Sequence, residues 1–406
     1  MIRYHAAWIV PIEGEPIRDA WMTVDHGRIV ALGRRAANDT TPGLDLGDVA
    51  IMPGLVNAHT HLELSYLRDR IAPAPYFTGW VRQILHARRE RMQQPLREPG
   101  VMEAIDAAID ESVRSGTAVV GEITNTLFLT FEKIAHSPLA GVVFWELLGF
   151  NLPDANFDEL VAHAVSDLND LPATENVRPS LAAHAPYSVA PLFFRAIKQA
   201  VSRMPFAPCS VHLAEGAEEI ELLMTGGGPW KTIMTDIGAW NHAWTAPGVG
   251  PVQYLDDMGF LDSRLLAVHG VQMSAEDLEK LRARGVTLVT CPRSNGHTGA
   301  GLPPIADFYK SGIRVAIGTD SLASAPDLNV FAEVATLHAL APSVPPASLL
   351  ESATIQGARA LGFDADYGSI EPGKLARVLA VDVPPGTTDV EEYLVSGIHP
   401  GQIRWL

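Results

Sequence analysis

Six side chains suited to binding a metal ion stand at the ends of apolar runs in this sequence. His59 and His61 lie two residues apart, so in an extended backbone both imidazoles fall on the same face and can bind one ion. Four others end later apolar runs: His184, His212, His269 and Asp320. Because imidazole nitrogens and carboxylate oxygens are preferred ligands of divalent transition-metal ions, the pattern predicts a metal site wherever these side chains meet.

The elements that carry these side chains have the pattern of repeated strand–helix units. Apolar runs of five to eight residues alternate with longer helical stretches, which is typical of buried parallel strands. Eight runs have this character: Ile51–Ala58, Ala118–Thr124, Gly141–Leu148, Pro179–His184, Cys209–Leu213, Leu265–Gly270, Val286–Cys291 and Val315–Thr319. They predict an α/β fold, a (β/α)8 TIM barrel, in which all the strand ends share one mouth.

Both ends of the chain have a different pattern, with short strands and tight turns. Neither end has enough apolar strands for a core of its own. We therefore predict one composite β-sandwich domain from residues 1–53 and 362–406, beside a barrel of residues 54–361. Within the barrel, Gly226 to Pro251 is rich in glycine and tryptophan, which is more often typical of an active-site lid than of a spacer. The sequence leaves open whether this segment moves.

Motifs at the predicted strand ends resemble those of the metal-dependent amidohydrolase superfamily, in its aminohydrolase branch of deaminases and chlorohydrolases. The resemblance covers essentially the whole chain and rests on six segments: 53–61, 212–215, 268–270, 291–295, 318–321 and 368–374. It departs from the family only in the tail, where Leu-Ala-Arg follows Lys374 in place of the usual Ala-Asp-Leu. The resemblance implies that the ion is held by four side chains: His59, His61, His212 and Asp320.

The number of ions follows from a residue that this chain lacks. Binuclear members of the superfamily bridge two metals with a carboxylated lysine at the end of strand four. Here residues 184–187 read His-Ala-Pro-Tyr, and the nearest lysines, Lys133 and Lys198, fall in predicted helices. We predict one divalent ion, with Zn²⁺ as the first choice and Fe²⁺, Mn²⁺ or Co²⁺ as alternatives.

Such an ion would support the hydrolysis of an amine from a heterocycle. It lowers the pKa of bound water from 15.7 toward ~7, and the departing amine then needs a proton shuttle. Glu215, three residues after His212, is similar to the family's acid/base glutamate. The alternative is a solvated glutamate in the first turn of the next helix. We assign His269 to orienting and polarising the attacking water, and Asp320 to metal ligation and to accepting a hydrogen bond from that water.

Candidate substrate contacts lie around the same predicted mouth. His184 and Ser324 match positions where the branch touches substrate, and we favour this interpretation of His184 over that of a satisfied strand-end histidine. Three acids are further candidates: Glu63, Glu122 and Glu146. For Glu63 the alternative is an acid that covers the first turn of a helix.

The substrate itself is suggested by two short segments. Residues 61–65 (HLELS) and 77–81 (FTGWV) together resemble the aminodeoxyfutalosine deaminases of menaquinone biosynthesis. These enzymes convert a 6-aminopurine nucleoside derivative to its 6-oxo form and release ammonia. The resemblance therefore implies a hydrolase that acts on carbon–nitrogen bonds in cyclic amidines and uses a divalent metal ion such as zinc.

Composition restricts the partners of the protein. The 406 residues carry a net charge of −17, which repels nucleic acids and anionic membrane surfaces. Two cysteines cannot form a disulfide framework, and no segment approaches ~18 uncharged apolar residues. We predict a cytoplasmic enzyme that binds a small heterocyclic amine, no nucleic-acid polymer and no membrane, and the family adds homodimer formation as an option.

Two alternatives to a deaminase remain. The same mononuclear site could hydrolyse another carbon–nitrogen or carbon–halogen bond, in a cyclic amide, a triazine, a guanine or an S-adenosylhomocysteine-type substrate. The chain could also be a catalytically inactive binding protein on this fold. An inactive binding protein would have lost some of its metal-ligating residues, whereas every predicted metal ligand and Glu215 are present in this chain.

Overall fold

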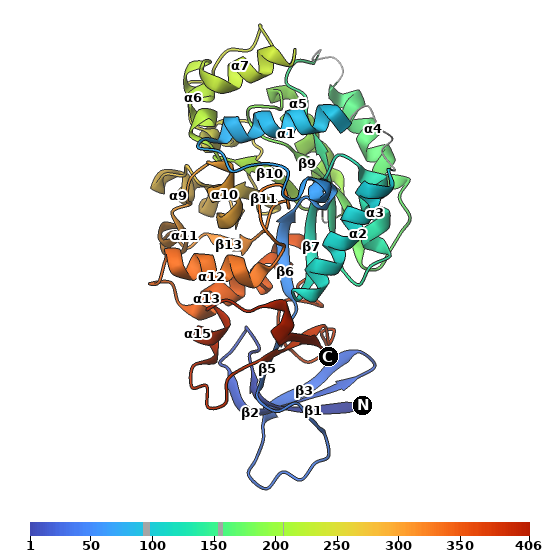
Figure 1. Cartoon of the computed structure of the whole chain (residues 1–406). Helices are drawn as coiled ribbons and strands as arrows, with labels where there is room; N and C mark the ends of the chain where they lie inside the picture. Colours follow the sequence, from blue (N-terminus) through green and yellow to red (C-terminus); the bar gives the residue numbers. More distant parts are fainter. Residues whose placement is uncertain (92–97, 153–156, 206) are drawn as a thin grey trace.

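Eight parallel strands form the barrel, seen in the computed structural model of Figure 1, which describes residues 1–91, 98–152, 157–205 and 207–406. Hydrogen-bonded neighbours follow chain order, from β6 to β13. The strands are β6 (Leu55–Thr60), β7 (Thr117–Thr124), β8 (Ala140–Leu147), β9 (Val177–Ala183), β10 (Cys209–Leu213), β11 (Leu265–His269), β12 (Thr287–Thr290) and β13 (Arg314–Ile317). The predicted (β/α)8 barrel is confirmed.

The barrel closes between its first and last strands. Thr60 at the end of β6 forms a parallel bridge with Asp320, just beyond β13. The backbone N–H groups of Thr319 and Asp320 both donate to the carbonyl oxygen of His59, at 3.1 Å each. Two of the predicted ligand residues, His59 and Asp320, therefore take part in the closure itself.

Helices surround the barrel strands. Those of the first half are η1 (Leu62–Leu67), α1 (Phe77–Arg91), α2 (Pro99–Arg114), α3 (Leu127–Ala135), α4 (Phe157–Asn169), α5 (Pro191–Arg203), α6 (Ala217–Thr225), α7 (Gly228–Asp236) and α8 (Pro251–Asp257). Those of the second half are α9 (Ala275–Ala283), α10 (Pro292–Thr298), α11 (Ile305–Ser311), α12 (Val330–Leu340), α13 (Pro346–Ser352) and α14 (Ile355–Leu361). Beyond the barrel lie α15 (Val390–Leu394) and η3 (Pro400–Gln402).

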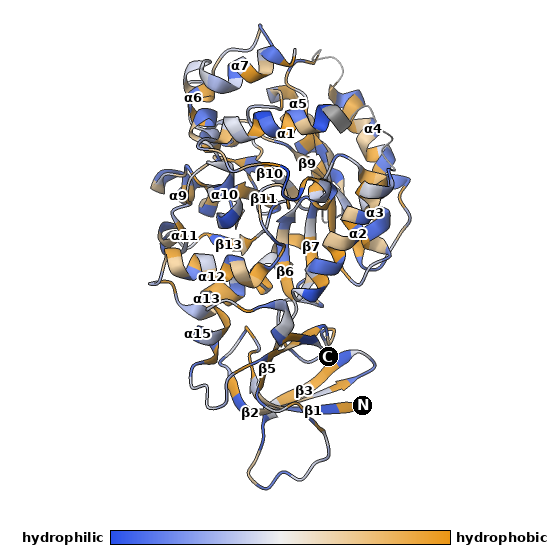
Figure 2. Cartoon of the chain, in the orientation of Figure 1, coloured by the Kyte–Doolittle hydropathy of each residue, from blue (hydrophilic) through white to orange (hydrophobic). Residues whose placement is uncertain are grey.

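Helix α2 shows why these segments form an outer layer. Its buried residues recur at helical spacing on one face: Val101, Ile105, Ala108, Ile109 and Ser112. Figure 2 shows the corresponding mixture of hydrophobic and hydrophilic stretches along α1 and α2. Among the residues that the structure describes, no helix is both long and apolar enough to cross a membrane.

The two chain ends meet in a second sheet, at the end of the barrel opposite α1, α6 and α7 (Figure 1). Its order is β15-β14-β5-β1-β2-β3, with β4 paired to β1. The strands are β1 (Ile2–Ile9), β2 (Ile17–Asp25), β3 (Arg28–Arg34), β4 (Leu44–Asp45), β5 (Val49–Pro53), β14 (Val378–Asp382) and β15 (Ile403–Trp405). The union of both ends agrees with the prediction, and it is one continuous sheet.

This terminal sheet is buried on both faces where it meets the barrel. In β5, Val49 and Ile51 join the sheet's own core, whereas Ala50 and Met52 pack with the barrel core. The alternation fixes the sheet to the barrel. The exact residue limits proposed for the two domains stay a prediction.

The prediction of a single strand over Ile51–Ala58 was wrong. Residues 51–53 belong to β5 of the terminal sheet, and Leu55 begins β6 of the barrel. Gly54 separates them, and a Cβ atom there would lie 2.6 Å from the Cβ of Ala118. Hydrophobicity is continuous because both sheets bury this segment, so the pattern alone does not reveal the change of sheet.

Gly318 provides a test of the closure. A Cβ atom at this position would lie 2.7 Å from both the Cβ and the carbonyl oxygen of His59, and 2.9 Å from the Sγ of Cys291. Gly318→Ala should therefore lower the free energy of unfolding by about 1–3 kcal/mol, measured by denaturant titration. Gly100→Ala, where no atom lies within 4 Å, is the control and should change it by less than about 1 kcal/mol. Equal stability of the two variants would contradict this packing.

Candidate active site

A cavity of about 700 Å³ opens at the carboxyl ends of the barrel strands. Side chains from the predicted constellation line one side of it: His61, His184, His212, Glu215, His269 and Asp320. Aromatic residues from the surrounding elements line much of the rest: Phe77, Trp80, Phe150, Tyr187 and Trp230. The sequence prediction that these strand ends meet in one mouth is therefore matched by the position of the side chains.

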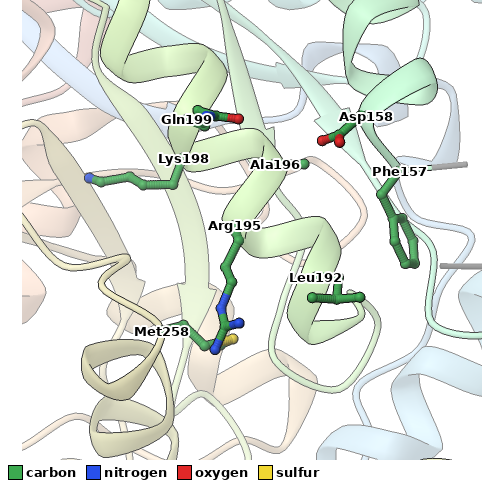
Figure 3. Close-up of a pocket in the computed structure, with 8 residues that line it drawn as sticks. All are labelled: Phe157, Asp158, Leu192, Arg195, Ala196, Lys198, Gln199 and Met258. Carbon is green, nitrogen blue, oxygen red and sulfur yellow. The ribbon is translucent and has the colours of Figure 1, made fainter. Parts of the chain in front are cut away.

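A second cavity, of about 460 Å³, lies outside the barrel and lacks this chemistry (Figure 3). It is formed at α4 and α5, with Asp158, Arg195 and Lys198 among its lining residues. Lys198 is already paired with Asp262, at 2.7 Å. Since neither histidine nor cysteine lines it, the barrel mouth is the better candidate for catalysis.

Four polar atoms converge at the floor of the mouth. The imidazole nitrogens of His59, His61 and His212 lie within 4.8 Å of one another, and the two Nε2 atoms of His61 and His212 are 3.4 Å apart. The Oδ1 atom of Asp320 lies 3.8 Å from Nε2 of His59 and 3.7 Å from Nε2 of His61. This is the donor set that the sequence predicted.

The burial of His59 shows whether these residues could hold a metal ion. Its side chain is fully buried, and neither ring nitrogen has a hydrogen-bond partner. An unpartnered buried polar group costs free energy, so native structures nearly always satisfy it. Burial lowers the pKa of His59 well below its usual range and that of His212 to about 3, so both rings are neutral and have a lone pair to offer. These residues fit a divalent cation.

Neighbouring groups aim the donor atoms. The Nδ1–H of His212 donates to the carbonyl oxygen of His184 at 2.9 Å, which leaves Nε2 as the free lone pair. The Oδ2 atom of Asp320 accepts hydrogen bonds from the hydroxyls of Ser294, at 2.5 Å, and Ser324, at 3.1 Å. Oδ1 of Asp320 is therefore the oxygen that faces the histidines.

The backbone at the mouth is strained. Ala214, His269 and Asp320 have φ angles of +52°, +77° and +58°, in the left-handed region that residues with a side chain rarely adopt. They follow or end β10, β11 and β13, where the chain turns sharply out of the barrel. Each such conformation costs on the order of 1–3 kcal/mol, and clusters of them are typical of functional sites.

Glu215 and His269 are two further candidate catalytic groups, beside the cluster of His59, His61, His212 and Asp320. The Oε2 atom of Glu215 lies 3.5 Å from Nε2 of His269, and the Nδ1 atom of His269 lies 2.9 Å from Nδ2 of Asn295. Burial, and then the charge of Asp320, raise the pKa of Glu215 well above its usual range. A carboxyl group with a raised pKa keeps its proton to a higher pH than a solvated glutamate does, as a general acid requires.

His184 and Glu146 lie in the cavity as the sequence predicted. Nε2 of His184 is 4.0 Å from Oε1 of Glu146, and that oxygen is buried without a hydrogen-bond partner. Asn125 donates to the other carboxylate oxygen at 3.2 Å and fixes its direction. Glu146 therefore presents an unused acceptor beside His184.

Glu63 and Glu122 do not line the cavity, so the structure does not support them as substrate contacts. The Oε2 atom of Glu63 accepts hydrogen bonds from the backbone N–H groups of Asn125 and Thr126, at 2.9 and 3.0 Å, just before α3. Glu122 accepts a hydrogen bond from the backbone N–H of Leu62 at 2.9 Å, where η1 begins. Both acids are turned toward backbone N–H groups at the starts of helices, where intrahelical acceptors are lacking.

Ser324 also departs from its predicted contact. It has no exposed surface and does not line the cavity. Its hydroxyl is directed to Asp320, as described above, so it lies behind the carboxylate and away from the space available to a substrate.

Several lining residues had no assigned part in the sequence analysis. Arg88 donates to Oδ1 of Asn125 at 2.9 Å, and Asn125 in turn donates to Glu146. The rings of Tyr187 and Trp230 stack with their centroids 3.7 Å apart, and Trp230 belongs to α7, within the segment predicted as a lid. The glycine and tryptophan content of that segment was the available signal. Arg88 and Asn125 gave none, because they lie away from the recognised motifs.

The comparison with known families agrees with this geometry. Residues 50–400 match the amidohydrolase family. The chain belongs to this family. Members of the family are metal-dependent hydrolases, and here the histidine cluster provides the corresponding donor set.

Named relatives of this family member are deaminases. The aminodeoxyfutalosine deaminase of Deinococcus radiodurans is 33% identical over 320 residues, covering 77% of this chain and 73% of the relative. The 5-methylthioadenosine/S-adenosylhomocysteine deaminase of Moorella thermoacetica is 29% identical over 406 residues, covering 95% and 88%. The crystal structure of an adenosine deaminase from Xanthomonas campestris with bound zinc has a TM-score of 0.80 and 28% identity, covering 99% of this chain and 90% of that one.

The position of Ser324 makes a distinct prediction. Ser324→Ala should weaken metal affinity by about 10-fold and leave KM nearly unchanged, because the hydroxyl supports Asp320. Competition with a chelator measures the affinity, and steady-state kinetics of the metal-loaded enzyme measure KM. Ser202→Ala, an exposed hydroxyl on α5 that bonds only the carbonyl oxygen of Lys198, is the control. A raised KM with unchanged metal affinity would restore Ser324 as a substrate contact.

Proposed function

We propose that this amidohydrolase is a mononuclear metal-dependent deaminase, which replaces the amino group of a 6-aminopurine nucleoside derivative, such as aminodeoxyfutalosine, with oxygen. Water and the amine are consumed, and the 6-oxo product and ammonia are released. The observation that carries the proposal is the convergence of the histidine cluster of His59, His61 and His212 and of the buried Glu215 on one cavity. The deaminase relative from Deinococcus radiodurans supports the reaction class.

The metal ligands in this proposal are His59, His61, His212 and Asp320. A bound divalent ion would supply a hydroxide-like nucleophile at neutral pH. We propose Zn²⁺ as the resident ion, because the structural neighbour from Xanthomonas campestris contains zinc and imidazole-rich donor sets suit it. One ion is expected, since the lysine that would bridge two is absent from the end of β9.

The remaining residues handle protons and orientation. Glu215 would donate its proton to a ring nitrogen as the attacked carbon becomes tetrahedral. It would then take a proton from the hydroxyl group that the attacking water leaves on that carbon, and would pass this proton to the leaving amine as the carbon–oxygen double bond forms. His269, held by Asn295, would orient the attacking water together with Asp320. His184 and Glu146, which line the cavity beside His212, would contact the purine derivative.

The size and lining of the cavity suit a nucleoside. About 700 Å³ lies within the range of roughly 300–1,000 Å³ that small-molecule sites occupy. The aromatic side chains of Trp80, Phe150 and Tyr187 provide faces against which planar rings can stack. The unpartnered oxygen of Glu146 provides an acceptor for a hydroxyl or amine donor.

A second candidate substrate is 5-methylthioadenosine or S-adenosylhomocysteine. The relative from Moorella thermoacetica, named for both compounds, covers 95% of this chain. The reaction at the purine ring would be the same, so only the group attached to the ribose distinguishes the two candidates. The first proposal, with aminodeoxyfutalosine as substrate, includes a cytoplasmic location and a place in menaquinone biosynthesis. Homodimer formation stays a prediction.

A substrate panel tests the proposal. The zinc-loaded protein is incubated with aminodeoxyfutalosine, 5-methylthioadenosine, S-adenosylhomocysteine, adenosine, guanine, a pterin and a triazine, and ammonia is measured. Aminodeoxyfutalosine should give the highest kcat/KM. Preference for 5-methylthioadenosine would favour the second candidate, whereas halide release without ammonia, or no turnover of any amine, would contradict a deaminase.

The proton shuttle is tested in the same assay. Glu215→Gln should bind one equivalent of metal and lose about 10²–10⁴-fold in kcat, because a side-chain amide does not act as an acid or a base near neutral pH. Elemental analysis measures the metal. Wild-type kcat in this variant would remove Glu215 from the reaction.

A further inference from the structure

Glu219 is a fully buried carboxyl group that the proposed reaction does not use. It lies in the first turn of α6, one helical turn after Glu215. Its Oε2 atom accepts a hydrogen bond from the backbone N–H of Glu215 at 3.2 Å, and its Oε1 atom has no partner. A buried acid at this place needs a physical reason, because burial alone disfavours it.

The contact to Glu215 differs from ordinary helix capping. Gly216 is the N-cap residue of α6 and has no side chain with which to cap the helix. A glutamate at the third helical position usually reaches back to the backbone N–H of the N-cap residue. Glu219 occupies that position but reaches one residue further, to Glu215. Its carboxyl group therefore spans the turn between β10 and α6.

That turn contains one of the strained residues of the mouth. Ala214, directly before Glu215, has its φ angle of +52° here. A strained conformation persists only where surrounding contacts hold it. Glu219 supplies such a contact directly after Ala214, through the backbone N–H of Glu215.

The adjacent acid of α6 makes a different contact. The Oε1 atom of Glu218 accepts hydrogen bonds from the backbone N–H and the hydroxyl of Thr78, at 3.3 and 3.1 Å, where α1 begins. Glu218 thus connects α6 to α1, and Glu219 connects α6 to the turn that carries Glu215. The two neighbouring carboxyl groups are not interchangeable.

We infer that Glu219 is a positioning residue for Glu215: by accepting the backbone N–H of Glu215 next to the strained Ala214, it directs the Glu215 carboxyl toward His269 and the cavity. This inference rests on the proposed function of Glu215 as proton shuttle. Burial raises the pKa of Glu219 to about 8, so its acceptor at neutral pH is largely a neutral carboxyl oxygen. A glutamine amide offers an equivalent oxygen in the same place, whereas methionine has a similar shape and no such acceptor.

The test compares Glu219→Gln and Glu219→Met in the full-length, zinc-loaded enzyme, with the best amine of the substrate panel. Glu219→Gln should retain kcat within about threefold. Glu219→Met should lose at least about 10-fold in kcat, with KM within about threefold and one equivalent of metal still bound. Glu221→Met, on the exposed side of α6, is the matched control and should retain wild-type kcat. If the Met variant does not fold, Glu219→Asp, which shortens the reach by one methylene, should show the same loss in kcat.

A crystal structure of the Met or Asp variant gives a readout that does not depend on activity. We expect the backbone at Ala214 to leave the left-handed region and the Glu215 carboxyl to move away from His269. An unmoved turn, a Met variant with kcat within twofold of wild type, or equal losses in Gln and Met would overturn the inference. Absence of deaminase activity in the wild-type enzyme would instead overturn the proposed function, and the crystal structure would still decide the positioning.

Discussion

The structure depends on a group of buried histidine and carboxylate side chains that converge at the mouth of a barrel. His59 is the extreme case, since it is completely buried and both of its ring nitrogens are unpartnered. Leaving such groups unsatisfied would cost several kcal/mol, and a bound divalent cation would offset that cost by coordination. The buried histidines, the aimed carboxylate of Asp320 and the family's dependence on metal therefore have one common explanation.

The barrel keeps these side chains in place through its backbone. The carbonyl oxygen of His59 receives two N–H groups from the last strand end, and Gly318 permits that close approach. The sharp turns at His269 and Asp320 carry positive φ angles. Hydrogen bonds from Ser294 and from His212 to the carbonyl oxygen of His184 then set which atoms of Asp320 and His212 would face an ion. Asp320, for example, has both a strained backbone conformation and a side chain held by hydrogen bonds.

Much of this arrangement could be predicted from the sequence, because buried parallel strands leave long apolar runs and barrel topology fixes where each run ends. His61, His212, Glu215 and Asp320 all follow from that reasoning and line one cavity. The acids are harder to predict. Glu63 bonds to backbone N–H groups that only tertiary folding brings near, and nothing in its local sequence distinguishes this from a substrate contact.

The most direct test of the account is a crystal structure of the zinc-loaded protein, with anomalous diffraction collected on both sides of the zinc absorption edge. We predict one zinc peak per chain, within coordination distance of His59, His61 and His212 and of Oδ1 of Asp320. A peak elsewhere, a second peak of equal height in the mouth, or an empty histidine cluster in protein that deaminates its substrate would contradict the account.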